Sequence, residues 1–179
     1  MSKPKIATDW MAGCSGCHMS LLDIDERILQ VLELIDLRAS PITDLKEADE
    51  SGVDVGILEG GINNTSNEHQ AKLMRSRCKY LVALGDCAVF GGVPAMRNFF
   101  TIEETLKRAY IDTESTVEGF IPTDPELAVP TRVRAVQEVV PVDLHVPGCP
   151  PNADVIFHVL VELAQGRIPE LKDENLHWH

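Results

Sequence analysis

Residues 80–87 read Tyr-Leu-Val-Ala-Leu-Gly-Asp-Cys and contain the clearest strand of the chain. The apolar run 80–84 has no polar interruption, which is typical of a strand that is covered on both faces of a parallel sheet. A glycine ends the run and permits a sharp turn. Residues 53–58, Val-Asp-Val-Gly-Ile-Leu, follow the same plan and lead into Glu59-Gly-Gly61. Both runs indicate buried parallel strands that end in tight turns.

Strand and helix patterns alternate along the rest of the chain. We expect five strands, at 5–10, 37–39, 53–58, 80–84 and 142–146. Helical spacing and capping-box patterns predict helices at 20–35, 66–77, 101–110 and from Pro150-Pro151 to about Gly166. Proline breaks up residues 112–143, which we predict to be a long irregular insertion. The alternation predicts the α/β class: one flavodoxin-like, doubly wound parallel sheet forming a single domain over 1–179.

Composition narrows the function classes. The chain has 179 residues, and its 16 Lys and Arg against 28 Asp and Glu give a net charge of −12. This charge makes a poor electrostatic match for nucleic acid or an anionic membrane surface. No apolar stretch reaches the ~20 residues of a membrane span, and the first ten residues resemble no export signal. We therefore expect a cytoplasmic protein without membrane insertion or nucleic-acid binding.

Five cysteines carry the sharpest signal. An odd number in a chain without an export signal argues against a disulfide framework. Cys14 and Cys17 form Cys-Ser-Gly-Cys, Cys87 follows Gly-Asp, and Cys149 lies in Pro-Gly-Cys-Pro-Pro. Glycine allows a close approach of the backbone to a bulky group, and proline fixes a turn. Cys78 has neither residue beside it, and we expect it to be a buried structural thiol.

Four of these cysteines follow the carboxyl ends of predicted strands. Cys14 and Cys17 come after the first strand, Cys87 after the fourth and Cys149 after the fifth. These ends share one edge of a parallel sheet, where ligands bind. Four thiolates suit one cubane iron–sulfur cluster, and they also suit a zinc ion in an interaction module. A flavin-binding electron carrier is a weaker alternative, because residues 8–17 lack a Ser/Thr-rich phosphate cradle.

Three cysteine motifs together resemble a known family. They are Trp-Met-Ala-Gly-Cys-Ser-Gly-Cys at 10–17, Gly-Asp-Cys-Ala at 85–88 and Pro-Gly-Cys-Pro-Pro at 147–151. In this order and spacing they resemble the small subunit of nickel–iron hydrogenases, in particular the short small subunit of the soluble, bidirectional NAD-reducing type. The resemblance covers about residues 5–165.

The resemblance implies an electron-transfer subunit of an oxidoreductase complex. Cys14, Cys17, Cys87 and Cys149 would hold one proximal [4Fe–4S] cluster. The catalytic Ni–Fe site would lie in a separate large subunit, so this chain would carry no catalytic residue. Electrons would continue through iron–sulfur and flavin subunits of a diaphorase module to NAD. A hydrogenase with another acceptor, a quinone-oxidoreductase-like complex and an additional flavin remain alternatives.

The chain departs from the family in two respects. Met19 occupies the position, two after Cys17, where the family often has a carboxylate. The sequence has no further cysteines for the additional clusters that many family members hold. We therefore expect the chain to pass electrons to another polypeptide, and we predict that residues 112–143 pack at a subunit interface.

Four more residues have predicted positions near this edge. Glu59 is expected there, at an interface or handling protons, with a solvated acid in a glycine turn as the alternative. We expect His18 at the surface or an interface. Trp10 is expected beside the cysteine loop or in the core, and Asp86 as the cap of the following helix.

Overall fold

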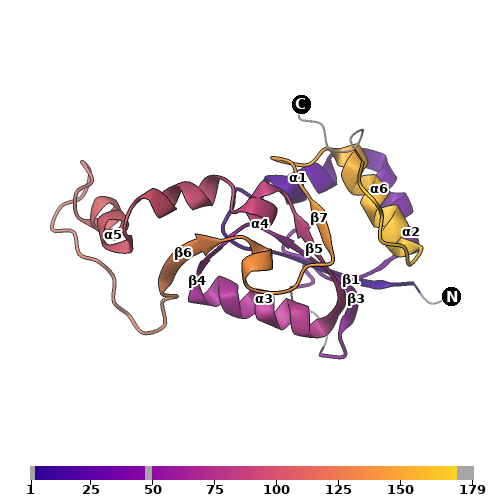
Figure 1. Cartoon of the computed structure of the whole chain (residues 1–179), viewed down its shortest axis with the longest axis horizontal. Coiled ribbons are helices and arrows are strands. Elements are labelled where there is room, and N and C mark those ends of the chain that lie inside the picture. Colours follow the sequence, from indigo (N-terminus) through magenta and orange to yellow (C-terminus); the bar gives the residue numbers. More distant parts are fainter. Residues whose placement is uncertain (1–2, 47–49, 173–179) are drawn as a thin grey trace.

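A five-stranded parallel sheet forms the centre of the molecule (Figure 1). The computed structural model describes residues 3–46 and 50–172, so the predicted single domain over 1–179 includes residues outside these ranges. The strand order is β2-β1-β3-β5-β7, and each neighbouring pair is parallel. The strands are β1 (Lys5–Trp10), β2 (Asp36–Ala39), β3 (Val53–Glu59), β5 (Cys78–Leu84) and β7 (Leu144–Val146). This order is flavodoxin-like, and the predicted fold class is confirmed.

Helices cover both faces of the sheet because successive strand residues point to opposite sides. Ile6, Ile57 and Val82 pack on one side against α1 (Gly16–Leu22), α2 (Ile28–Leu34) and α6 (Ala153–Ala164). On the other side the next residue of each strand packs against α3 (Thr65–Arg77) and α4 (Asp86–Phe90). The molecule therefore has two apolar cores, one on each face of the sheet.

The predicted helix at 20–35 is in fact interrupted. α1 ends at Leu22, and a 3₁₀ turn, η1 (Asp25–Arg27), separates it from α2. Asp25 has a φ of 57°, which a continuous right-handed helix cannot include. α1 also begins earlier than predicted, so Cys17 lies in its first turn.

Capping interactions explain where two other helices begin. Thr101 caps α5 (Ile102–Tyr110) in the predicted capping box with Glu104. The sequence Thr65-Ser-Asn-Glu68 also predicts a capping box, but this prediction is wrong: Asn64 caps α3, and its side chain accepts a hydrogen bond from the Asn67 amide. The earlier asparagine takes over the role because its carboxamide reaches the same orphan amides.

Residues 112–143 are less irregular than predicted. They contain β6 (Pro130–Arg134), which pairs antiparallel with β4 (Ile62–Asn64), and the 3₁₀ turn η3 (Val136–Glu138). β4 and β6 lie far apart in sequence, so no local sequence pattern predicts that they pair. β7 is also shorter than the expected 142–146.

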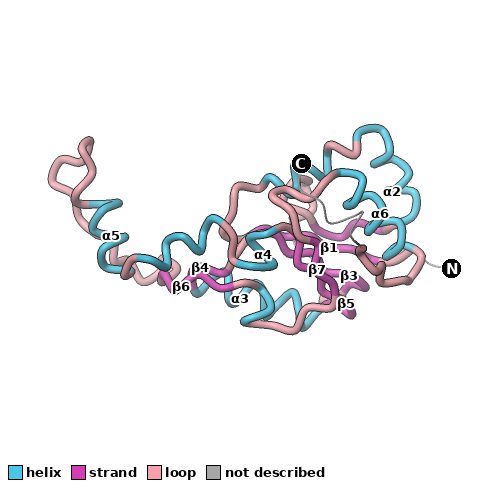
Figure 2. Tube along the Cα trace, turned by 45° about the horizontal axis from the view of Figure 1, so that its top comes forward, coloured by secondary structure: helices cyan, strands magenta, loops and turns pink. Residues whose placement is uncertain are grey.

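Residues 93–129, here called the arm, project from the body of the molecule (Figures 1 and 2). The arm consists of the 3₁₀ segment η2 (Val93–Phe99), α5 and the loop that returns to β6. Arg97 holds its base by donating hydrogen bonds to the carbonyls of Asn63 and Thr131. Within the described ranges, no helix has the length and apolar character needed to cross a membrane.

Replacing a core leucine tests this packing. Leu81 is fully buried in β5, and we expect Leu81→Ala to lower the free energy of unfolding by about 2–5 kcal/mol through lost burial and a residual cavity. Leu29→Ala is the control, because Leu29 is 64% exposed on α2, and it should change the value by less than about 0.5 kcal/mol. Urea unfolding measures both, and equal effects would contradict the assigned core.

Candidate metal centre

Three loops at the carboxyl edge of the sheet bring four cysteines together. Cys14 and Cys17 lie between β1 and α1, Cys87 lies at the start of α4 after β5, and Cys149 lies between β7 and α6. A Cβ atom built on Gly85 would lie 2.2 Å from the Cys17 sulfur and 3.5 Å from the Gly148 carbonyl oxygen. All three loops therefore meet around Gly85.

Electrostatic effects reflect the same proximity. Burial raises the pKa of the Cys17 thiol far above its usual range, and negative charge on Glu59, Cys87, Cys14 and Cys149 raises it further. Burial also raises the pKa of Cys87, although a hydrogen bond from the Val93 amide opposes the shift. Four thiolates at this edge would repel one another, so a cationic group between them would be stabilising.

Two glycines lack the side chain that would otherwise overlap the cysteine sulfurs. Gly85 has a φ of 81°, and any side chain there would displace Cys17. Gly92 has a φ of 47°, and a Cβ there would lie 2.9 Å from the nitrogen, Cα and sulfur of Cys87. This clearance fits the sequence-based expectation that glycine beside cysteine permits a close approach.

Amide groups point at two of the sulfurs. The Gly16 amide donates to the Cys14 sulfur at 3.4 Å, and the Val93 amide donates to Cys87. Amides directed at thiolate sulfur stabilise the anionic form and tune the potential of a thiolate-bound cluster.

Asp86 has a different role from the one predicted. Gly85 takes the N-cap position of α4, and no side chain caps the helix. The Asp86 carboxylate instead accepts a hydrogen bond from the Gly148 amide at 2.7 Å, and the Asp86 amide donates to the Gly148 carbonyl at 2.9 Å. Asp86 thus ties the Cys87 loop to the Cys149 loop, a long-range contact that the local sequence did not signal.

Glu59 and His18 are both buried beside the cysteines. Glu59 is 2% exposed and accepts hydrogen bonds from the amides of Cys17 at 3.3 Å and His18 at 2.9 Å. The alternative of a solvated acid is therefore wrong. His18 was expected at a surface or interface, but it is 0% exposed and its Nδ1 contacts the Glu59 carboxylate. Its burial follows from the turn that starts α1 and directs residue 18 into the sheet edge.

Several neighbours remain accessible at this edge. Cys14 and Cys149 are exposed, and so are Trp10 and Met19. Trp10 packs edge-on against His18, with ring centroids 5.6 Å apart, so it lies beside the cysteine loop as one of the two expected alternatives. The candidate centre thus has one open side on which another polypeptide could dock.

Cys78 lies apart from the other four. It is the first residue of β5, at the opposite end of the strand from Cys87, and its sulfur faces Gly56 of β3. Burial raises its pKa, which is typical of an inert structural thiol.

No group of three His, Cys, Asp or Glu side chains within the described ranges closes tightly enough to hold a single metal ion. The fit of the four thiols to a larger cluster rests on the clearance at Gly85 and Gly92, on the amides directed at Cys14 and Cys87, and on the all-thiolate donor set.

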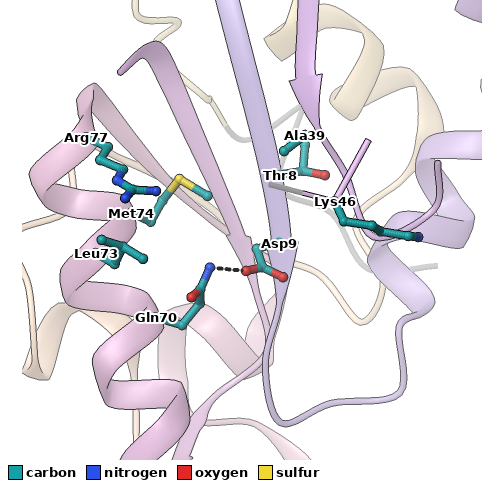
Figure 3. A pocket seen from close by; sticks show the side chains of 8 residues that line it. All are labelled: Thr8, Asp9, Ala39, Lys46, Gln70, Leu73, Met74 and Arg77. Carbon is teal, nitrogen blue, oxygen red and sulfur yellow. Dashed lines mark hydrogen bonds between the residues drawn. The ribbon is translucent and has the colours of Figure 1, made fainter. Parts of the chain in front are cut away.

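A separate hollow of about 260 Å³ lies between β1 and α3 (Figure 3). Gln70 of α3 donates a hydrogen bond across it to Asp9 of β1. Its remaining lining residues are Thr8, Ala39, Lys46, Leu73, Met74 and Arg77. No cysteine lines this hollow, so it is distinct from the candidate centre.

A flavodoxin-like sheet with four cysteines gathered at its carboxyl edge is the arrangement found in a class of oxidoreductase subunits, and the comparisons with known proteins identify the family. The chain belongs to the family described as NADH ubiquinone oxidoreductase, 20 Kd subunit, which matches residues 14–163. The resemblance to hydrogenase small subunits, expected from the three cysteine motifs, is confirmed by named relatives.

The delta subunit of the NAD-reducing hydrogenase HoxS of Cupriavidus necator is 41% identical over 169 residues, which are 92% of this chain and 80% of the relative. A chain of a solved NAD⁺-reducing [NiFe]-hydrogenase superposes with a TM-score of 0.93 at 38% identity, covering 99% of this chain and 100% of that one. A subunit of the F420-non-reducing hydrogenase of Methanothermobacter marburgensis is 41% identical over 97% of this chain. The chain spans only 58% of the length of that relative.

Gly85→Ala tests the clearance beside Cys17. Gly166→Ala is a matched control, because Gly166 has a φ of 76° and a Cβ there would meet nothing within 4 Å. Both substitutions should cost about 1–3 kcal/mol of backbone strain, because both positions have a positive φ, but only Gly85→Ala should also lose iron bound during anaerobic reconstitution. Iron analysis and urea unfolding measure these effects. Equal iron content in the two variants would contradict the steric role of Gly85.

Proposed function

We propose that the chain is the electron-transfer small subunit of an NAD-reducing [NiFe]-hydrogenase. In this proposal Cys14, Cys17, Cys87 and Cys149 ligate one proximal [4Fe–4S] cluster. The cluster lies between the Ni–Fe site of a large subunit and the clusters of a diaphorase module. The main observation that supports this proposal is that three loops bring four thiols together around Gly85. The likeness to HoxS delta and to the NAD⁺-reducing [NiFe]-hydrogenase chain supports the choice of complex.

When bound, a [4Fe–4S] cluster supplies one-electron transfer. The residues of this chain determine its surroundings. The amides of Gly16 and Val93 stabilise the sulfurs of Cys14 and Cys87, and the burial of Cys17 excludes water from the inner side. Buried Glu59 holds the turn that carries Cys17. These groups would fix the cluster and set the free energy of adding an electron.

The large subunit is proposed to cover the open side of the centre. Cys14 and Cys149 are exposed there, and a cluster left open to water would differ in potential from a buried one. Electron transfer also requires that the two redox sites lie close together. An exposed edge with Trp10 and Met19 around it suits such an interface.

A hydrogenase with another electron acceptor is the second candidate. The 41% identity to the F420-non-reducing hydrogenase chain favours it. The purified complex distinguishes the two candidates: hydrogen-dependent reduction of NAD⁺ supports the first. Reduction of viologen dyes without any reduction of NAD⁺ supports the second.

Cysteine substitutions test the ligand set. Cys14→Ala, Cys17→Ala, Cys87→Ala and Cys149→Ala should each abolish or strongly reduce bound iron and acid-labile sulfide, because each removes one thiolate ligand. Cys78→Ala is the matched control and should retain both. Elemental analysis of the anaerobically reconstituted chain and low-temperature EPR of the same chain after reduction with dithionite measure the outcome. The ligand assignment fails if Cys149→Ala keeps the wild-type EPR signal.

The arm is the second proposed contact with the large subunit. Phe99 is 84% exposed and Val117 is 89% exposed. Other exposed apolar residues on or beside the arm are Phe90, Val93, Met96, Phe100, Phe120, Leu127 and Val129. A monomer rarely exposes so many large apolar side chains on one projecting element. The arm follows Gly92, which lies against Cys87, so its first apolar residues lie next to the edge of the centre.

Charged substitutions on the arm should weaken assembly. We expect Phe99→Asp and Phe120→Asp each to raise the Kd for the large subunit by about tenfold, equivalent to about 1.4 kcal/mol, and so to reduce the large subunit that co-purifies with a tagged chain. Leu29→Asp is the control, because Leu29 is an exposed leucine on α2, far from the arm in Figure 1. Unchanged co-purification with both arm variants would refute the proposed interface.

A further inference from the structure

Four of the buried polar residues form one hydrogen-bonded line. These residues are Glu59, His18, Thr8 and Ser40, none more than 6% exposed. Burying polar groups is costly unless each is paired, and here each link of the line is a hydrogen bond. The line runs from the cysteine loop, across the end of β1, to the end of β2.

The line begins at the backbone of the cysteine loop. The Glu59 carboxylate accepts the amides of both Cys17 and His18, so its position fixes the first turn of α1. Its negative charge raises the pKa of both Cys17 and Cys87. Glu59 is therefore close enough to influence any charge carried by the thiolates.

His18 connects Glu59 to the interior of the sheet. Its Nδ1 contacts Glu59 Oε2, and its Nε2 lies 3.0 Å from the Thr8 hydroxyl oxygen. Trp10 packs edge-on against the ring. Both ring nitrogens are thus engaged, and the imidazole can leave Glu59 only if the bond to Thr8 also breaks.

The contact with Ser40 assigns the donor and acceptor roles of the Thr8 hydroxyl. Thr8 donates its one hydroxyl proton to Ser40 Oγ at 2.8 Å. The Thr8 oxygen is then free to accept from His18 Nε2–H, and a second proton, on the Nδ1 side, is shared between the imidazole and the Glu59 carboxylate. This arrangement holds the Nδ1 side of the imidazole toward Glu59.

We propose that Thr8 and Ser40 are positioning residues that hold His18 against Glu59, and that the Glu59–His18 pair sets the electrostatic surroundings of the iron–sulfur cluster. This inference rests on the proposed function. Partners that orient a charged group beside a metal centre tune its affinity and potential. Here a carboxylate beside the thiolates opposes the addition of an electron, and the imidazole that caps it weakens this opposition.

The test is a redox titration of the complete complex followed by EPR. Glu59→Gln keeps an acceptor for the two amides and removes the charge. Thr8→Val keeps the shape of the side chain and removes the hydroxyl. Thr8→Ser restores the hydroxyl and is the matched control. All three should retain iron and sulfide, because each keeps the four cysteines and leaves the clearance at Gly85 and Gly92 unchanged.

The two main variants should shift the midpoint potential in opposite directions. Glu59→Gln should raise the ratio of reduced to oxidised cluster at a fixed potential by about tenfold, which is about 59 mV for a one-electron couple. Thr8→Val should lower this ratio by at least about threefold, because the imidazole is no longer held against the carboxylate. Thr8→Ser should remain within about twofold of wild type. A purely structural defect would not produce opposite shifts with rescue by serine.

Three results would overturn the inference. They are a wild-type potential in Thr8→Val with an intact cluster, shifts of the same sign in Glu59→Gln and Thr8→Val, and an equal shift in Thr8→Ser and Thr8→Val. If Thr8→Val loses its cluster, Ser40→Ala replaces it, with a smaller shift of the same sign expected, and no shift there also overturns the inference. A wild-type complex whose small subunit binds no iron and sulfide refutes the proposed function instead.

Discussion

The parallel pairing of β1, β3, β5 and β7 places the three cysteine loops on one edge of the sheet. The chain leaves β1 toward α1 on one face and leaves β3 toward α3 on the other. This divergence opens the edge at the point where strand order reverses. Cys17 can therefore reach Gly85 although β3 lies between their strands. Without parallel pairing, Cys14 and Cys149 would belong to unrelated parts of the surface.

The charge around this edge distinguishes it from an ordinary sheet end. The chain carries a net charge of −12, and a buried carboxylate, Glu59, lies among the cysteines. Anionic groups gathered in a poorly solvated place repel one another. The amides of Gly16, Cys17 and His18 offset part of this repulsion by donating to Cys14 and Glu59. Under the proposed function, the iron–sulfur core would offset a further part of the thiolate charge, and the cluster with its four thiolates would remain anionic.

Two surfaces of the molecule are open to water: the apolar side chains of the arm, and the edge of the sheet with the exposed Cys14 and Cys149. The two surfaces adjoin at Gly92, which lies against Cys87. Apolar side chains exposed on a projecting element are costly in water, and the exposed thiols of Cys14 and Cys149 are open to solvent. A single partner that covers both would remove both costs at once. The family relationship to named hydrogenase subunits is consistent with such a division of labour between chains.

Sequence alone was enough to predict the strands of the main sheet and most helices, because burial periodicity, glycine turns and the Thr101 capping box are local signals. The alternation of strands and helices suggested a doubly wound order, which the structure establishes. It also singled out the four cysteines and their common edge, which follow from the direction of parallel strands. It did not reveal the β4–β6 pair, the break at Asp25, the bond from Asp86 to Gly148, or the burial of His18. These features depend on contacts between segments that are distant along the chain. Only the folded arrangement decides which polar groups face each other, since hydrogen bonding depends on distance and direction in space.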